Sequence, residues 1–125
     1  MKTTGFLILH DKNFDGSKDL KESLHGEQND IYRDKIINYL ESGYSFTGVP
    51  LMLHDDEGVA FNGLEYLTDG VWIWPNYYAY YLKKYPSMKI EEEFINYLTQ
   101  INFFLKELTK EEKLNADKYF QDHIW

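Results

Sequence analysis

A hairpin signal in the middle of the chain constrains the fold most strongly. Two runs rich in β-forming residues, 64–67 and 71–74, are separated by Thr68-Asp69-Gly70. Asp-Gly between such runs predicts a tight turn, because glycine accepts the positive φ that the turn requires. Side chains alternate along a strand, so the second run has two tryptophans on one face and Val and Ile on the other. A strand that is apolar on both faces is usually covered on both sides.

The segment before this hairpin is also typical of β structure. Short apolar-rich runs separated by turn residues form the pattern of a meander, and these runs are 44–46, 49–53 and 59–61. Pro50 lacks a backbone donor, so its run is an edge strand at best. The sequence therefore predicts a small, mostly antiparallel sheet over about residues 44–74. A further apolar run, residues 6–9, is either a strand or an anchored terminus.

Apolar residues at helical spacing predict helices before and after the sheet. The expected helices cover about residues 30–42, 75–85, 91–108 and 109–123, and one helical turn is expected around 18–24 within the polar segment 10–28. Asn29 or Asp30 is expected to cap the first helix, and Gly43 to follow it in a left-handed conformation. Pro75 suits the first turn of the second helix, and residues 109–112 form a capping box for the last. The chain is expected to be a single α+β domain over residues 1–125.

Charge and composition exclude several classes of function. The net charge is −8 and the isoelectric point is about 4.9. Binding to phosphate backbones or to anionic membranes needs clustered Lys and Arg, so neither a nucleic acid nor a membrane is expected as a direct partner. The chain has no cysteine, which excludes disulfides and thiolate-bound zinc and fits a reducing cytoplasm. The first apolar run is too short for a signal peptide, so a cytoplasmic protein is expected. No cofactor is expected either.

The acidic residues are segregated along the sequence. No Lys or Arg lies between Lys35 and Lys83, although the chain has 13 basic residues, and the end of this stretch overlaps eight Tyr and Trp between residues 66 and 85. A surface of one sign attracts the opposite charge, and Tyr and Trp are frequent at interface centres. Tyr77 and Tyr80 fall outside the inward stripe of their helix and are expected to be exposed. The candidate residues for binding a basic protein are Asp55, Asp56, Glu57, Glu65, Asp69, Tyr77 and Tyr80.

Two other functions remain open from the residues alone. Trp72 and Trp74 could stack on a carbohydrate or a peptide, although filling the core is the commoner role of such side chains. His54, Asp55 and Asp56 are of types that bind metals or act in hydrolases, but their spacing matches no standard metal site. The chain contains no nucleophile elbow, P-loop or dinucleotide fingerprint. We therefore expect neither enzymatic activity nor a metal ion.

One part of the chain resembles a known group of proteins. The run Tyr66-Leu67-Thr68-Asp69-Gly70-Val71-Trp72-Ile73-Trp74-Pro75, followed by Tyr80-Tyr81 and Glu92-Glu93-Phe94-Ile95, resembles a pattern in small bacterial immunity proteins. These accompany polymorphic toxins and contact-dependent growth inhibition systems. The resemblance covers about residues 62–98, and Ile90-Glu91 replaces the expected Leu-Pro. It implies stoichiometric occlusion of a cognate toxin domain, often a basic nuclease, in the cytoplasm. Toxin-binding residues in such proteins are specific to each pair, so none is transferred by position.

Overall fold

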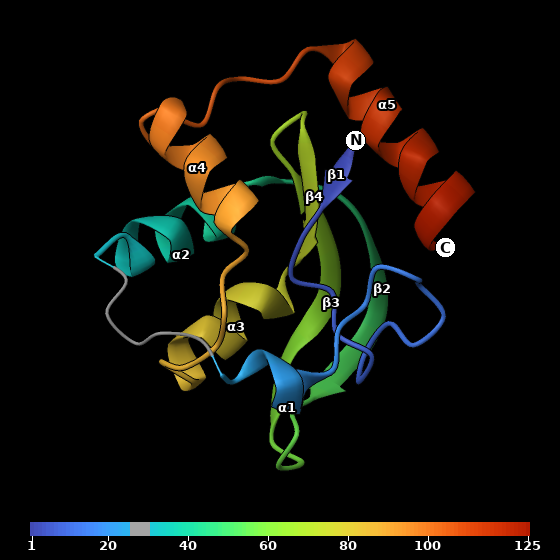
Figure 1. Ribbon diagram of the computed structural model, residues 1–125. Coiled ribbons are helices and arrows are strands. Elements are labelled where there is room, and N and C mark those ends of the chain that lie inside the picture. The colour runs from blue at the N-terminus through green and yellow to red at the C-terminus, as the bar shows by residue number, and fades with distance from the viewer. Residues whose placement is uncertain (26–30) are drawn as a thin grey trace.

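The computed structural model describes residues 1–25 and 31–125, which fold around a four-stranded mixed sheet (Figure 1). Its strands are β1 (Lys2–Thr3), β2 (Tyr44–His54), β3 (Ala60–Thr68) and β4 (Trp72–Pro75). The helices are α1 (Leu20–Ser23), α2 (Arg33–Glu41), α3 (Tyr77–Lys84), α4 (Glu92–Gln100) and α5 (Lys110–Tyr119), and α5 continues into the π-helical turn η1 (Phe120–Ile124). The predicted α+β fold class is confirmed. No helix within the described residues combines the length and the apolarity that a membrane span needs.

The strands follow the order β1-β4-β3-β2 across the sheet. The pairs β2–β3 and β3–β4 are antiparallel, and β1 is parallel to β4. The prediction of several short strands before residue 71 is wrong, because β2 and β3 are continuous. Irregular pairing between Val49 and Met52 accommodates Pro50, as a β-bulge does when one strand carries extra residues. The predicted edge position of the Pro50 run is confirmed.

The hairpin between β3 and β4 forms as the Asp-Gly signal predicts. Gly70 has a φ of 94°. Asp69 accepts hydrogen bonds from the backbone nitrogens of Val71 and Trp72, at 2.9 and 2.8 Å. This aspartate therefore fixes the turn in addition to preceding it.

Strand β4 is covered on both faces, as its sequence predicts. On one face the Trp72 ring lies 5.0 Å from the ring of Phe94 in α4, and the Trp74 indole donates a hydrogen bond to Leu40 of α2. On the other face Tyr66 of β3 contacts Phe120. Figure 1 shows this arrangement, with α2 and α4 on one side of the sheet and α5 on the other.

The start of α3 and the end of α4 differ from the sequence prediction. Pro75 ends β4, so α3 starts at Tyr77. Helix α4 ends at Gln100, eight residues before the expected end at 108. Asn102, with a φ of 54°, lies at the position after the cap, and the next residue, Phe103, bonds back to the Leu98 carbonyl at 2.9 Å. This is a Schellman motif, in which Asn adopts the left-handed conformation that is usual for Gly.

The conformation of Gly43 also differs from the sequence prediction. It has no positive φ, but a Cβ atom there would lie 2.4 Å from the Trp74 ring. The glycine is therefore required by close packing, and the expectation of a left-handed residue is wrong.

The remaining expectations concern the two ends of the chain. The helical turn α1 and the capping box of Thr109 and Glu112 are confirmed. Phe6 and Leu7 are buried and anchor the first segment, while the strand itself forms earlier, at β1. The expected caps of the first helix, Asn29 and Asp30, and the end of the polar segment 10–28 lie outside the described residues.

Candidate functional site

The loop between β2 and β3 is held in place by Asp55. One carboxylate oxygen, Oδ1, accepts hydrogen bonds from the backbone nitrogens of Glu57 and Val59, each at 2.9 Å. The other, Oδ2, accepts from the hydroxyl of Tyr80 at 2.6 Å and from Nζ of Lys84 at 2.9 Å. The loop is therefore ordered both internally and by helix α3.

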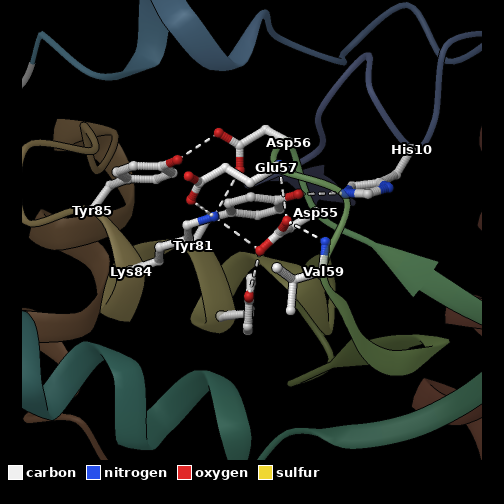
Figure 2. A network of polar contacts seen from close by, with 9 residues as sticks. His10, Asp55, Asp56, Glu57, Val59, Tyr81, Lys84 and Tyr85 are labelled. Atoms are coloured by element: carbon white, nitrogen blue, oxygen red, sulfur yellow. Dashed lines mark hydrogen bonds and ion pairs between the residues drawn. The ribbon is translucent and has the colours of Figure 1, made fainter.

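Lys84 brings three consecutive carboxylates together (Figure 2). Its Nζ also lies 3.1 Å from Oδ1 of Asp56 and 2.6 Å from Oε1 of Glu57, and Tyr85 donates its hydroxyl to Asp56 at 2.5 Å. The Asp55 side chain is 1% exposed and the Glu57 side chain 65%. One ammonium faces three carboxylates, so the tip of the β2–β3 hairpin keeps a negative charge.

These contacts change the acidity of the groups involved. Hydrogen bonds from Tyr80 and then Lys84 hold the pKa of Asp55 well below its ordinary value. Burial alone would raise the pKa of Asp56, but bonds from Tyr85 and Lys84 outweigh it and lower that pKa. Burial opposes the charge of Lys84, whereas its bonds to the three carboxylates raise its pKa. Asp55, Asp56 and Lys84 therefore stay ionised at neutral pH.

Tyr80 connects this hairpin tip to a neighbouring depression. Its ring stacks on Phe61 of β3 at a centroid distance of 3.9 Å, and the residue is half-buried, which corrects its expected exposure. It also lines a depression of about 370 Å³ whose walls come from α2, β3 and α3 and include Glu41 and Glu65. Tyr80 therefore lies beside four other predicted site residues, namely Asp55, Asp56, Glu57 and Glu65.

Asp69 and Tyr77, the other two predicted residues, lie elsewhere. Asp69 is buried at the opposite end of β3, where it accepts the hydroxyls of Tyr39 and Tyr97 at 2.5 and 2.9 Å. Tyr77 is fully buried, which corrects its expected exposure. Its hydroxyl donates to Asp11 and accepts from the Leu7 backbone at 3.0 Å. The first segment of the chain thus packs against the side of α3 that carries Tyr77. The apolar stripe of α3 did not predict that this side would be buried.

A shared pattern explains why some predicted surface acids are internal. Among the described residues, six tyrosines donate hydroxyls to four aspartates: Tyr39, Tyr66, Tyr77, Tyr80, Tyr85 and Tyr97 to Asp11, Asp55, Asp56 and Asp69. A buried tyrosine hydroxyl needs a hydrogen-bond partner. The large number of tyrosines therefore indicates that some carboxylates accept hydrogen bonds from tyrosines inside the fold.

Sequence reasoning missed two residues of the polar network in Figure 2, Lys84 and His10. Lys84 lies four residues after Tyr80, so both project from the same face of α3. His10 lies 2.8 Å from the Tyr81 hydroxyl through Nε2, and burial lowers its pKa. No local sequence signal places His10 beside α3, because about half of the chain separates them.

Comparisons with protein-family models, curated proteins and solved structures find no match to this chain.

The structure also shows where the residues lie that were considered for binding a carbohydrate or peptide and for binding a metal ion. Trp72 and Trp74 are 2% and 0% exposed, so neither ring offers a face to a carbohydrate or a peptide. Within residues 1–25 and 31–125, no group of three or more His, Asp or Glu side chains is placed to hold a metal ion. Asp55 is instead occupied by Tyr80, Lys84 and its own loop.

Proposed function

We propose that this chain is an immunity-type inhibitor that binds a cognate, basic toxin domain and neutralises it by occlusion. The observation that carries the proposal is the assembly of acidic residues around Tyr80, at the β2–β3 hairpin tip and the depression beside it. Exposed carboxylates of Asp56, Glu57 and Glu65 would meet the positive surface of the toxin. Such complementarity accelerates association, up to about 10⁸–10⁹ M⁻¹s⁻¹ at low salt.

Exposed apolar side chains beside these carboxylates support a protein as the partner. Leu51, Met52 and Val59 on the β2–β3 hairpin are 54%, 56% and 56% exposed. In Figure 1 the tip of this hairpin projects beyond the helices. Apolar patches bordered by polar residues are typical of protein interaction sites. The hairpin would supply both the apolar contact and the acidic border.

The order of the hairpin loop favours tight binding. Asp55 and Lys84 already hold the loop in one conformation. Because an ordered loop loses little conformational entropy on binding, more of the contact energy remains as affinity. In this proposal Lys84 is a positioning residue that presents Asp56 and Glu57 to the partner.

The resemblance of residues 62–98 to bacterial immunity proteins agrees with this function and suggests the cytoplasm as the place of action. The toxin would be blocked by a one-to-one complex, and no catalysis would be required of this chain. The residues shared with that pattern mostly form the β3–β4 hairpin and the start of α4. They would serve the scaffold, while the hairpin tip would provide specificity.

The test uses a candidate toxin domain chosen from the genes that neighbour the gene for this chain. We expect a one-to-one complex at micromolar concentration, loss of toxin activity, and association that slows as salt is raised. The double variant Asp56→Lys/Glu57→Lys should associate at least about tenfold more slowly. Asp55 is left unchanged because it holds the loop. Absence of a complex between the unmodified proteins at micromolar concentration would refute the proposal.

A matched control places the same charge change elsewhere. Asp117 and Asp122 are exposed on α5 and η1. The double variant Asp117→Lys/Asp122→Lys alters the net charge by the same amount, so it isolates the effect of position. Equal slowing by both double variants would show that net charge alone acts, and would remove the hairpin tip as the binding site.

A further inference from the structure

The depression beside Tyr80 has a mixed lining of apolar, polar and charged residues. Its volume is about 370 Å³, and its lining includes buried side chains of Leu67, Trp74 and Ala79. Glu41 and Glu65 line the same depression. A concave surface where a few placed polar groups lie beside apolar side chains can serve as a ligand site.

The two carboxylates differ in their partners. Glu41 forms an ion pair with Lys83, with 2.7 Å between Oε2 and Nζ. No side chain among the residues that the structure describes bonds the carboxylate of Glu65. The charge of Lys83 is thus matched by Glu41, and one negative charge in the depression has no counterpart. A cation is the ligand that this arrangement favours.

Asn76 fixes the wall that carries Glu65. Its Oδ1 accepts from the Glu65 backbone nitrogen at 3.0 Å, and its Nδ2 donates to the Gly63 carbonyl at 2.5 Å. The backbone nitrogen of Asn76 also donates to the Glu65 carbonyl at 2.9 Å. Strand β3 and the start of α3 are therefore joined at the depression, which keeps its shape without a ligand.

We propose that this depression binds an arginine side chain from the protein partner, an inference that rests on the proposed function. A guanidinium is planar and weakly hydrated, so it suits a partly apolar site better than an ammonium does. It can donate two parallel hydrogen bonds to the carboxylate of Glu65. The ring of Tyr80 in the wall provides an aromatic surface against which guanidinium groups pack. The hairpin tip would contact the basic surface around that arginine.

The first experiment needs no toxin. Amide chemical shifts of the ¹⁵N-labelled protein are followed while N-acetyl-arginine methylamide is added, alongside the corresponding lysine and citrulline compounds. We expect saturable shifts at Glu65, Asn76 and Ala79 with the arginine compound, and none with citrulline, which has a similar shape but no charge. Equal shifts with citrulline would overturn the proposal. Equal affinity for the lysine compound would overturn the assignment of a guanidinium.

Two variants that remove the same charge localise the effect. Glu65→Gln should weaken binding of the arginine compound by about tenfold, because a hydrogen bond to a charged group is lost. Glu111→Gln removes an exposed carboxylate from helix α5, outside the depression, and should leave the affinity unchanged. Unaltered binding by Glu65→Gln would refute the site.

The same variants separate this inference from the proposed function. If the toxin domain binds Glu65→Gln as tightly as the unmodified chain, and binds Asp56→Lys/Glu57→Lys more weakly, the arginine site is refuted and the inhibitor function stands. If the unmodified chain binds the arginine compound but no toxin domain, the proposed function is refuted.

Discussion

The ammonium of Lys84 lies 2.9 Å from a carboxylate oxygen of Asp55, whose side chain is almost completely buried. This ion pair joins the β2–β3 loop to helix α3. Removing one member of a buried pair is far more costly than forming the pair is favourable, because the other charge is left without a partner. Lys84 therefore contributes, together with Tyr80 and the backbone bonds of Asp55, to the geometry of the proposed binding surface.

Replacing Lys84 by Met should destabilise the protein and loosen the loop. We expect a clear fall in melting temperature and faster hydrogen exchange at the amides of Glu57 and Val59, which Asp55 holds. Lys83→Met is the matched control. Lys83 pairs with Glu41 at the surface, so its loss should change stability by less than about 1 kcal/mol. Equal exchange rates in both variants would contradict the role given to Lys84.

Stability should fall at acidic pH partly through Asp55. Bonds from Tyr80 and Lys84 lower the pKa of Asp55 in the folded state. Below about pH 4, the ordinary pKa of Asp, the unfolded chain therefore binds a proton that the folded chain does not. The stabilisation is complete above this pH and is lost as the pH falls toward the lowered pKa. Urea midpoints between pH 2 and 6 should show a shallower slope for Asp55→Asn and Tyr80→Phe. A slope identical to that of the unmodified chain would refute this assignment.

Asp69 should contribute strongly to stability without contributing to partner binding. Asp69→Ala leaves the hydroxyls of the buried Tyr39 and the partly buried Tyr97, and the turn amides, without an acceptor. The expected loss is roughly 3 kcal/mol in the free energy of unfolding, measured by urea denaturation. Asp122→Ala, at an exposed position, should change it by less than about 0.5 kcal/mol. A loss of similar size in both variants would show that the hydrogen bonds at Asp69 carry little energy.

The elements that sequence predicted well depend on contacts between near neighbours. The Asp69-Gly70 turn and the capping box at Thr109 are set by residues within four positions of each other. The apolar faces of β4 predicted its burial for the same reason. These local signals, together with the helical periodicity, were sufficient for the α+β fold class.

The errors arose where distant segments meet. The acceptor for Tyr77 is Asp11, and that for Tyr80 is Asp55. A sequence shows that tyrosines need acceptors but not which carboxylates they reach. The expectation that the acidic stretch lies at the surface therefore holds for Glu57 and Glu65 and fails for Asp55 and Asp69.

The end of helix α4 offers a test of a local signal that was overlooked. The apolar periodicity continues past Gln100, but Asn102 is left-handed and terminates the helix. Asn102→Gly should be neutral or slightly stabilising, whereas Asn102→Ala should cost about 1 kcal/mol, because a Cβ disfavours this conformation. Thermal denaturation of both variants provides the measurement. Greater stability of the Ala variant would mean that the helix can extend.

Gly43 should tolerate no side chain. A Cβ at this position would lie 2.4 Å from the Trp74 ring, whereas at Gly63 the nearest atom is 3.9 Å away. Gly43→Ala should therefore cost about 1–3 kcal/mol through overpacking, while Gly63→Ala should be close to neutral. Chemical denaturation compares the two directly, and equal stabilities would show that the tryptophan moves aside at no cost.

The parallel pairing of β1 with β4 affects how the protein is made. The paired residues are separated by more than half of the chain, and pairing over such distances is slow to form. Phe6 and Leu7 leave the ribosome long before Tyr66 and Tyr77, which contact them in the folded protein. During synthesis, Phe6 and Leu7 therefore remain exposed to solvent until Tyr66 and Tyr77 have been made. Chaperones can bind these apolar residues during that interval.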